Sequence, residues 1–322
     1  MPFSRIIASG SALPEKVVTN HDLEKILDTS DNWIRERTGI EERRVAADGQ
    51  TTCDLAEAAC RIVFERSGVD PQSIDLLVVG TTTPDLIFPS TACLLQHRLG
   101  MQECGAFDVN AACSGFMYAL SVADKFIRSG TVKRALVVGA ETLTRMIDWN
   151  DRGTAVLFGD GAGAVLLEAS EAAGILSTHI HANGGHANLL CADVGVSKGF
   201  KDEPNGGLKV LMSGHEVFKV AVRTLGRIVD ETLAANNMDQ SEIDWLIPHQ
   251  ANLRIISATA KKLSMPMEKV IVTVHKHGNT SSASVPLALD EAISSGKVQR
   301  GENLLLEAFG GGFTWGAALI RY

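Results

Sequence analysis

The stretch ALSVADKFIRSGTVKRALVVGAE, residues 119–141, has a second version later in the chain, ALDEAISSGKVQRGENLLLEAFGG at residues 288–311. Each version begins with a helical pattern, continues through Ser-Gly and a basic residue, and ends in an apolar run typical of a buried strand. A helix followed by a buried strand is the repeating unit of sheets that helices cover on their faces. The pair therefore predicts one such unit in each part of the chain.

A second pair of related segments occurs in the same order. PQSIDLLVVGTTTPD (71–85) resembles DQSEIDWLIPHQAN (239–252), since both place Ile-Asp before a buried strand and a polar loop after it. Ile74 and Ile243 are 169 residues apart, and the Ser-Gly pairs of the first repeat are 166 apart. Two matches at nearly one offset predict an internal duplication.

The duplication predicts the fold. Each half alternates helical patterns with apolar runs, which is typical of parallel or mixed sheets covered by helices. We expect halves at residues 1–174 and 175–322 that pack about a pseudo-twofold axis, with strand-end loops of both facing one crevice. We interpret residues 184–208, which are glycine-rich and weakly periodic, as an excursion or lid. The candidate strands are LLVVG (76–80), ALVVGA (135–140), AVLLE (164–168), WLIP (245–248), VIVTV (270–274) and LLLEAF (304–309).

Composition narrows the class of protein. The 322 residues carry a net charge of −8 and no Lys/Arg-rich tract, which argues against non-specific nucleic-acid binding. No run of about 18 apolar residues is present, so we expect no membrane span, and the N-terminal segment lacks the apolar region of a secretory signal. The six cysteines are scattered without C-x-x-C or zinc-ligand spacing, which favours a reducing, cytoplasmic location and no metal site.

Cys113 stands in DVNAACSGFMYAL, residues 108–120, between a strand-like segment and a helical pattern. Free cysteines are often small, buried core residues, and Cys113 fits that role. A cysteine at the start of a helix is also a candidate nucleophile, because the helix dipole lowers the pKa of its thiol. Both interpretations are open from this stretch alone.

The second half offers partners for Cys113. His249 follows the buried run 245–248, where functional loops gather, although a structural histidine fits there too. Asn279 precedes a helical pattern and also suits an ordinary helix cap or turn. Because the repeat puts Asn279 close to the position equivalent to Cys113, we expect these three residues to converge between the halves. The glycines at 310–312 leave backbone N–H groups free to bind an oxyanion, or form a tight hairpin.

Six segments spread over nearly the whole chain carry a family resemblance: LPEKVVTNHDLEKILDTSDNWIRERTGI (13–40), DVNAACSGF (108–116), DRGTAVLFGDGAGAVLLE (151–168), PHQAN (248–252), HGNTSSASVPLAL (277–289) and AFGGGFTWGAAL (308–319). Together they resemble the β-ketoacyl-acyl-carrier-protein synthase III family, the thiolase-fold enzymes that initiate bacterial type II fatty-acid synthesis. The resemblance implies an α/β, thiolase-like fold with two duplicated halves packed as five layers, α-β-α-β-α.

The resemblance also implies an acyltransferase reaction. Cys113 takes an acyl group from a short acyl-CoA, and the N–H groups of Cys113 and Gly311 form the oxyanion hole. His249 and Asn279 then donate hydrogen bonds to the thioester carbonyl of malonyl-acyl-carrier protein, whose decarboxylation yields the attacking carbanion. Phe309 keeps water from the enolate. The products are a 3-oxoacyl-acyl-carrier protein, CoA and CO2.

Further residues are implied as substrate contacts. Trp33 and Arg152 would sandwich the adenine of CoA, and Phe88 would reach across a homodimer to close a pocket for a short acyl group such as acetyl. The remaining CoA contacts implied by the resemblance are Thr29, Arg37, Gly214 and Asn252.

A local basic patch would have to attract the acidic carrier protein to a chain that is itself acidic. The candidates are Lys219, Arg254, Lys261 and Lys262, the last two of which also suit ordinary solvated lysines. No cofactor is implied, since acyl-CoA is a substrate. GDGAGA (159–164) lacks the lysine of a P-loop, and we interpret it as close strand packing.

Other functions share parts of this pattern. A papain-like hydrolase also uses Cys, His and Asn, but the duplication and PHQAN argue against it. A degradative thiolase has a second cysteine before its terminal glycine loop, where this chain has Glu307, Ala308 and Phe309. A non-catalytic scaffold would usually have lost Cys113. A condensing enzyme of secondary metabolism with a different primer would share all three residues and stays open.

Overall fold

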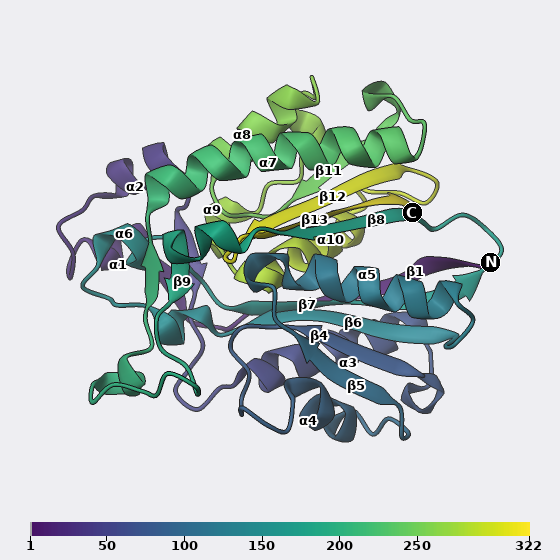
Figure 1. Cartoon of the computed structure of the whole chain (residues 1–322), viewed down its shortest axis with the longest axis horizontal. Helices are drawn as coiled ribbons and strands as arrows, with labels where there is room; N and C mark the ends of the chain where they lie inside the picture. The colour runs from purple at the N-terminus through teal and green to yellow at the C-terminus, as the bar shows by residue number, and fades with distance from the viewer. Residues whose placement is uncertain (1) are drawn as a thin grey trace.

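The computed structural model of the chain describes residues 2–322, which form two large mixed sheets (Figure 1). The first sheet has the order β1-β7-β6-β4-β5, and the second has the order β11-β12-β13-β8. The strands of the first are β1 Phe3–Ala12, β4 Leu76–Gly80, β5 Gly105–Val109, β6 Arg134–Glu141 and β7 Gly161–Ser170. The strands of the second are β8 Ile175–Ala182, β11 Trp245–Pro248, β12 Asn303–Gly310 and β13 Thr314–Arg321.

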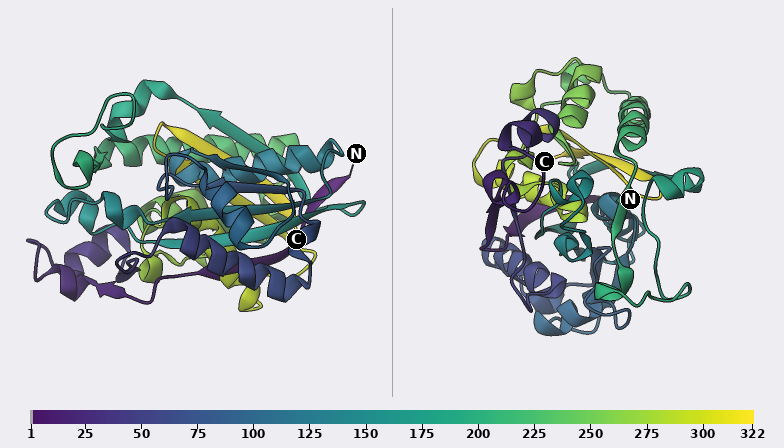
Figure 2. Two further views of the ribbon diagram at one scale, coloured as in Figure 1. Left: turned by 90° about the horizontal axis from the view of Figure 1, so that it is seen from below. Right: turned by 90° about the vertical axis from the view of Figure 1, so that its left-hand side faces the viewer.

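Helices cover the outer face of each sheet and fill the space between the sheets (Figures 1 and 2). The central layer consists of α5 (Gly115–Arg128), which contacts β4, β6, β8 and β13, and α10 (Ser284–Ser294), which contacts β1, β7, β11 and β12. The outer layers are α3 (Thr52–Ser67) and α4 (Thr91–Arg98) on the first sheet, and α7 (Gly214–Ala235) and α8 (Leu253–Lys262) on the second. This arrangement confirms the five predicted layers.

The remaining elements are short. They are β2 Val17–Thr19, α1 Asn20–Leu23, α2 Asp31–Thr38, β3 Glu42–Arg44, α6 Arg152–Ala155, β9 Leu190–Ala192, β10 Val210–Met212 and α9 Val274–His277. The 3-10 turns are η1 Pro71–Ser73, η2 Ala112–Ser114, η3 Leu143–Met146, η4 Gly184–Leu189, η5 Pro204–Gly207, η6 Gln240–Glu242, η7 Met267–Lys269 and η8 Ser281–Ala283. Within residues 2–322, no helix combines the length and apolarity needed to cross a membrane.

The duplication appears in the strand register. β4 pairs in parallel with β6 through Leu76 and Ala135, and β11 pairs in parallel with β12 through Trp245 and Leu304. Both partners of the second pair lie 169 residues after those of the first. The smaller offset of 166 in the sequence repeat arises because α10 has 11 residues and α5 has 14.

The segment VIVTV is not a strand, contrary to its apolar pattern. Val270 forms an isolated bridge with Leu246, and the backbone beyond it is bound by a side chain. The buried amide of Gln250 donates to the carbonyl oxygen of Ile271 and accepts from the N–H groups of Thr273 and Val274. This amide replaces the strand-to-strand hydrogen bonds that a ladder would have supplied.

Glycine-rich GDGAGA confirms its interpretation as a packing element. A Cβ atom at Gly163 on β7 would lie 2.7 Å from the carbonyl carbon of Pro286, so glycine lets α10 rest directly on the sheet. Residues 184–208 are an excursion between β8 and α7, and the short strands β9 and β10 pair at its base.

Candidate active site

Cys113 lies on the turn η2, directly before α5, where its backbone is under close constraint. Ala112 adopts a φ of 46°, in the left-handed region that alanine rarely occupies. Thr314 on β13 accepts a hydrogen bond at its carbonyl oxygen from Ser114 Oγ and donates through its own hydroxyl to Ala111. A Cβ atom at Gly310 would lie 2.6 Å from the Cys113 nitrogen. The last strands of the second half therefore hold the turn that carries the thiol.

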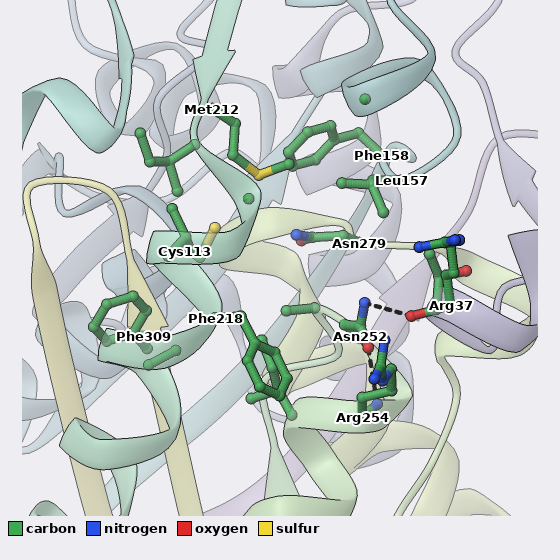
Figure 3. A pocket seen from close by; sticks show the side chains of 18 of the residues that line it. Arg37, Cys113, Leu157, Phe158, Met212, Phe218, Asn252, Arg254, Asn279 and Phe309 are labelled. Atoms are coloured by element: carbon green, nitrogen blue, oxygen red, sulfur yellow. Dashed lines mark hydrogen bonds between the residues drawn. The ribbon is translucent and has the colours of Figure 1, made fainter.

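Cys113, His249 and Asn279 line one cavity of about 490 Å³. Their exposed fractions are 7%, 6% and 6%, so all three are accessible only from inside the cavity. Cys113 and Asn279 both point into it (Figure 3). The structure thus brings together, from both halves, the three residues that the sequence predicts to converge.

Asn279 has a fixed orientation. Its side-chain oxygen accepts a hydrogen bond of 2.9 Å from the backbone N–H of Ser281. The oxygen is therefore engaged on the protein side, and the amide nitrogen is the group left to donate into the cavity.

His249 follows β11, and its backbone N–H donates to the Glu307 carbonyl oxygen at 2.8 Å. Burial lowers the pKa of the His249 ring to about 3, so the ring is neutral at pH 7. Nδ1 is buried and has no hydrogen-bond partner within residues 2–322, which leaves Nε2 as the nitrogen that can meet a substrate.

The Cys113 thiol is neutral in the empty site, contrary to the expectation from its place before a helix. Burial raises the pKa of the thiol to about 11, and the nearby Glu141 carboxylate also raises it. A hydrogen bond from Ser281 lowers the pKa but does not offset the loss of water. The expectation of a lowered pKa is wrong because removal of solvent outweighs the favourable dipole.

The mouth of this cavity contains several predicted CoA contacts. Trp33 and Arg37 on α2 line it together with Gly214 and Asn252. The Asn252 side chain caps α8 and donates to the Arg37 carbonyl oxygen at 3.0 Å, so it joins α8 to α2 (Figure 3). Arg254 and Phe309 complete the predicted residues along the lining.

Trp33 lies between two guanidinium groups. The Arg37 and Arg152 groups are each 4.7 Å from the Trp33 ring centroid. Arg152 also donates to the Asp28 carbonyl oxygen and lies against the ring, so a base can enter between them only if Arg152 moves. The neighbouring Thr29 hydroxyl is buried without a partner within the described chain and is absent from the residues lining this cavity.

A second cavity of about 520 Å³, which the sequence did not indicate, meets the first at Cys113. Gly311 lies in its wall beside Cys113. The apolar part of the lining includes Leu143, Met146, Phe158, Leu190 and Val210. Several of these residues come from the excursion and its hairpin, whose weak periodicity in the sequence hid a structural role. Cys113 is therefore reached from two sides.

Phe88 and the basic residues lie outside both cavities, apart from Arg254. Phe88 is 84% exposed on a loop beside exposed Leu86 and Ile87. Lys219 is exposed and paired with Glu216, and Lys262 is exposed and paired with Asp230. Arg223 and Arg227, also exposed, follow Lys219 at helical spacing along α7; this spacing is readable in the sequence and extends the patch beyond Arg254 and Lys261.

Comparisons with known proteins agree over the full chain. Residues 107–184 match the family model of 3-oxoacyl-[acyl-carrier-protein] synthase III, and residues 233–322 match that of its C-terminal part. The chain is 69% identical over 320 residues to a β-ketoacyl-[acyl-carrier-protein] synthase III of Xanthomonas campestris, covering 99% of this chain and 98% of the relative.

Two solved structures are similar throughout. A 3-oxoacyl-[acyl-carrier-protein] synthase III of Aquifex aeolicus superposes with a TM-score of 0.94 at 49% identity, covering 99% of this chain and 100% of that one. The priming β-ketosynthase of the R1128 polyketide pathway superposes with a TM-score of 0.93 at 37% identity, covering 99% and 96%.

Proposed function

The chain belongs to the 3-oxoacyl-[acyl-carrier-protein] synthase III family and is a condensing enzyme that initiates fatty-acid synthesis, and on this premise we propose that Cys113, His249 and Asn279 perform its reaction. The observation that carries the proposal is that these three buried side chains line one cavity. The reaction is a decarboxylative condensation of a short acyl-CoA, such as acetyl-CoA, with malonyl-acyl-carrier protein.

Acylation comes first. The Cys113 sulfur attacks the thioester carbonyl of acyl-CoA, CoA leaves, and an acyl-enzyme remains. The backbone N–H groups of Cys113 and Gly311 stabilise the oxyanion of the tetrahedral intermediate. The two residues line the same wall of the second cavity, which supports this pairing.

Decarboxylation and condensation follow. Loss of CO2 from the malonyl group leaves an enolate whose charge falls on the thioester oxygen. The neutral His249 ring and the Asn279 amide nitrogen donate to this oxygen, and they stabilise the charged state more than the neutral ground state. The carbanion then attacks the acyl carbonyl on Cys113 and forms the 3-oxoacyl product. Phe309, in the wall of the first cavity, excludes water from the enolate.

The two cavities divide the acyl-CoA between them. We place the CoA chain in the first cavity, with Arg37, Gly214 and Asn252 along it and the adenine at Trp33, which Arg152 covers from the other face beside Thr29. The apolar second cavity takes the acyl group. Its position on the far side of Cys113 supports this assignment.

Partners follow from the surface. Exposed Leu86, Ile87 and Phe88 support a homodimer in which a second copy covers this loop and Phe88 limits the acyl group. The carrier protein would bind at Lys219, Arg254, Lys261 and Lys262 on α7 and α8.

The remaining assignments concern the chain as a whole. The reaction as written uses no resident cofactor. Six unpaired cysteines support a cytoplasmic location. We keep the halves 1–174 and 175–322 as the proposed domains.

The test separates the two steps. Incubation with acetyl-CoA should add one acetyl mass to the peptide that contains Cys113, and absence of this adduct rejects the nucleophile. His249→Ala and Asn279→Ala should each slow malonyl decarboxylation by about 10²- to 10³-fold and change acetylation little. His97→Ala, on the exposed face of α4, serves as the control. Equal losses in both steps would contradict the division of roles.

A second candidate function is the priming of a polyketide chain. The 37% identity to the R1128 priming enzyme over nearly the whole chain favours it as the alternative. A panel of acyl-CoA primers with malonyl-acyl-carrier protein, analysed by product mass, distinguishes the two.

A further inference from the structure

The carboxyl group of Glu141 has no part in the reaction proposed above, although it lies close enough to Cys113 to affect the charge on its sulfur. Glu141 ends β6 and is completely buried. Its carboxylate accepts hydrogen bonds from the hydroxyls of Thr82 at 3.1 Å and Thr83 at 2.6 Å in the first half. From the second half it accepts from Ser281 at 3.1 Å and Ser282 at 3.0 Å. The carboxyl therefore joins the two halves directly beneath the candidate active site.

Ser281 stands between this carboxyl and the sulfur. Its hydroxyl bonds Glu141 Oε1 and also hydrogen-bonds the sulfur of Cys113. Its backbone N–H is held by Asn279, and its φ of 50° lies in the left-handed region, which is unfavourable for serine. Ser281 and Cys113 line the same cavity. The surrounding structure thus holds one hydroxyl in contact with both the nucleophile and a buried carboxylate.

The thiol needs a proton acceptor before it can attack. Burial raises the pKa of Cys113 to about 11, so little thiolate exists at pH 7. The other titratable group in the cavity wall beside it, His249, has a pKa of about 3 and is a weak base. Burial raises the pKa of Glu141, which makes its carboxylate a better acceptor than an ordinary glutamate.

We propose that Ser281 and Glu141 form a proton relay that takes the thiol proton of Cys113 during acylation and returns it during condensation. The proposal rests on the role of Cys113 proposed above. Ser281 touches the reacting sulfur, whereas Glu141 acts through Ser281.

The relay balances over one turnover. As the sulfur bonds to the acyl carbon, the thiol proton passes to Ser281 Oγ and the Ser281 hydroxyl proton passes to Glu141 Oε1. The bond from the acyl carbon to CoA breaks, and CoA leaves as a thiolate that takes a proton from water. In condensation the enolate carbon bonds to the acyl carbon, the bond to Cys113 breaks, and the thiolate recovers the proton from Glu141 through Ser281.

Both protonation states of Glu141 find partners in the structure. The ionised carboxylate accepts the Ser281 hydroxyl proton. The protonated form can donate from Oε1 to the oxygen of Ser282, because the Ser282 hydroxyl proton has a second acceptor, the Gly80 carbonyl oxygen, at 2.7 Å. A buried carboxyl that is satisfied in both states can hold a proton between two chemical steps.

The first test measures single-turnover acetylation between pH 7 and pH 9. In the unmodified chain the rate should change little with pH, because the proton stays within the protein. Glu141→Gln and Ser281→Ala should slow acetylation by about 10²- to 10⁴-fold at pH 7. Their rates should then rise about tenfold per pH unit as thiolate forms directly. Ser121→Ala on α5 is the matched control and should behave like the unmodified chain.

The second test needs no variant that risks misfolding. Infrared difference spectra of the chain carrying isotopically labelled glutamate should show a carboxylic-acid C=O band when Cys113 is acetylated, and the band should vanish on condensation. Glu141→Gln should lack the band.

A loss of equal size at every pH, or acetylation without the band, overturns the relay and leaves the role of Cys113 intact. Failure to form an acetyl adduct in the unmodified chain overturns the proposed function as well.

Discussion

Cys113 and Ser282 occupy the same position in the two halves of the molecule. Each is the second residue of a 3-10 turn, η2 or η8, that leads into a central helix. The preceding residues, Ala112 and Ser281, have φ angles of 46° and 50°. Cys113 opens onto two cavities, whereas Ser282 is completely buried and donates to Gly80. One backbone therefore supports a nucleophile in one half and a structural hydroxyl in the other.

The difference arises in the strand beneath each turn. η8 rests on the end of β6, where Glu141 binds both of its serines. The corresponding end of β12 is Gly310, whose missing side chain lets η2 approach to the backbone. A carboxylate locks one turn, and a glycine leaves the other free to face a substrate. Activity thus depends as much on the side chain that is absent at residue 310 as on the cysteine.

The largest expected effect comes from giving the first half the residue of the second. Cys113→Ser should reduce acetyl transfer by at least about a thousandfold, because a serine hydroxyl ionises far less readily than a thiol and the site offers a weak imidazole base. Condensation rate and adduct mass are the measurements. Cys104→Ser, outside both cavities, should retain activity. A Cys113→Ser enzyme with most of its activity would show that the two positions are chemically interchangeable.

A stability effect should follow at Glu307, whose counterpart in the first half is the apolar Val138. Glu307 is completely buried, neither carboxyl oxygen has a partner of normal hydrogen-bond geometry among residues 2–322, and burial raises its pKa from 4.5 to about 8. The Thr259 hydroxyl lowers this pKa but does not offset burial.

Because the unfolded chain releases this proton at lower pH, stability is greatest below about pH 4.5 and falls as the pH rises toward 8. At pH 7 the loss is on the order of 3 kcal/mol. Glu307→Gln should remove this slope in urea unfolding measured across the range. Glu268→Gln, at an exposed position, should keep it. An unchanged slope in Glu307→Gln would mean that the group is ionised inside the fold.

The smallest effect is expected at Gly310. Gly310→Ala places a methyl group 2.6 Å from the Cys113 nitrogen and should destabilise the chain by about 1–3 kcal/mol while slowing acetylation. Thermal unfolding and single-turnover acetylation measure the two effects. Gly184→Ala, with no atom within 4 Å of its new Cβ, is the control. If Gly310→Ala matched this control, the close approach would not be what separates the halves.

Local pattern predicted much of the fold. Helical periodicity, apolar runs and the repeat at 119–141 and 288–311 predicted five layers and the convergence of Cys113 with His249 and Asn279, because these signals lie within short segments. The pattern failed at residues 270–274, where a distant amide, Gln250, takes the place of a sheet partner. It also gave two offsets, 169 and 166, where the strands have 169, since a shortened helix shifted the Ser-Gly turn.

The sequence by itself determined the duplication, the order of the elements and the identity of the three candidate catalytic residues. Only the tertiary structure decided that the thiol is neutral, that a second cavity meets it, and that Glu141 reaches Ser281 across 140 residues. Protonation, cavity shape and long-range hydrogen bonds depend on how much water the packed halves exclude. That exclusion is a property of two surfaces in contact, and no single segment of the chain encodes it.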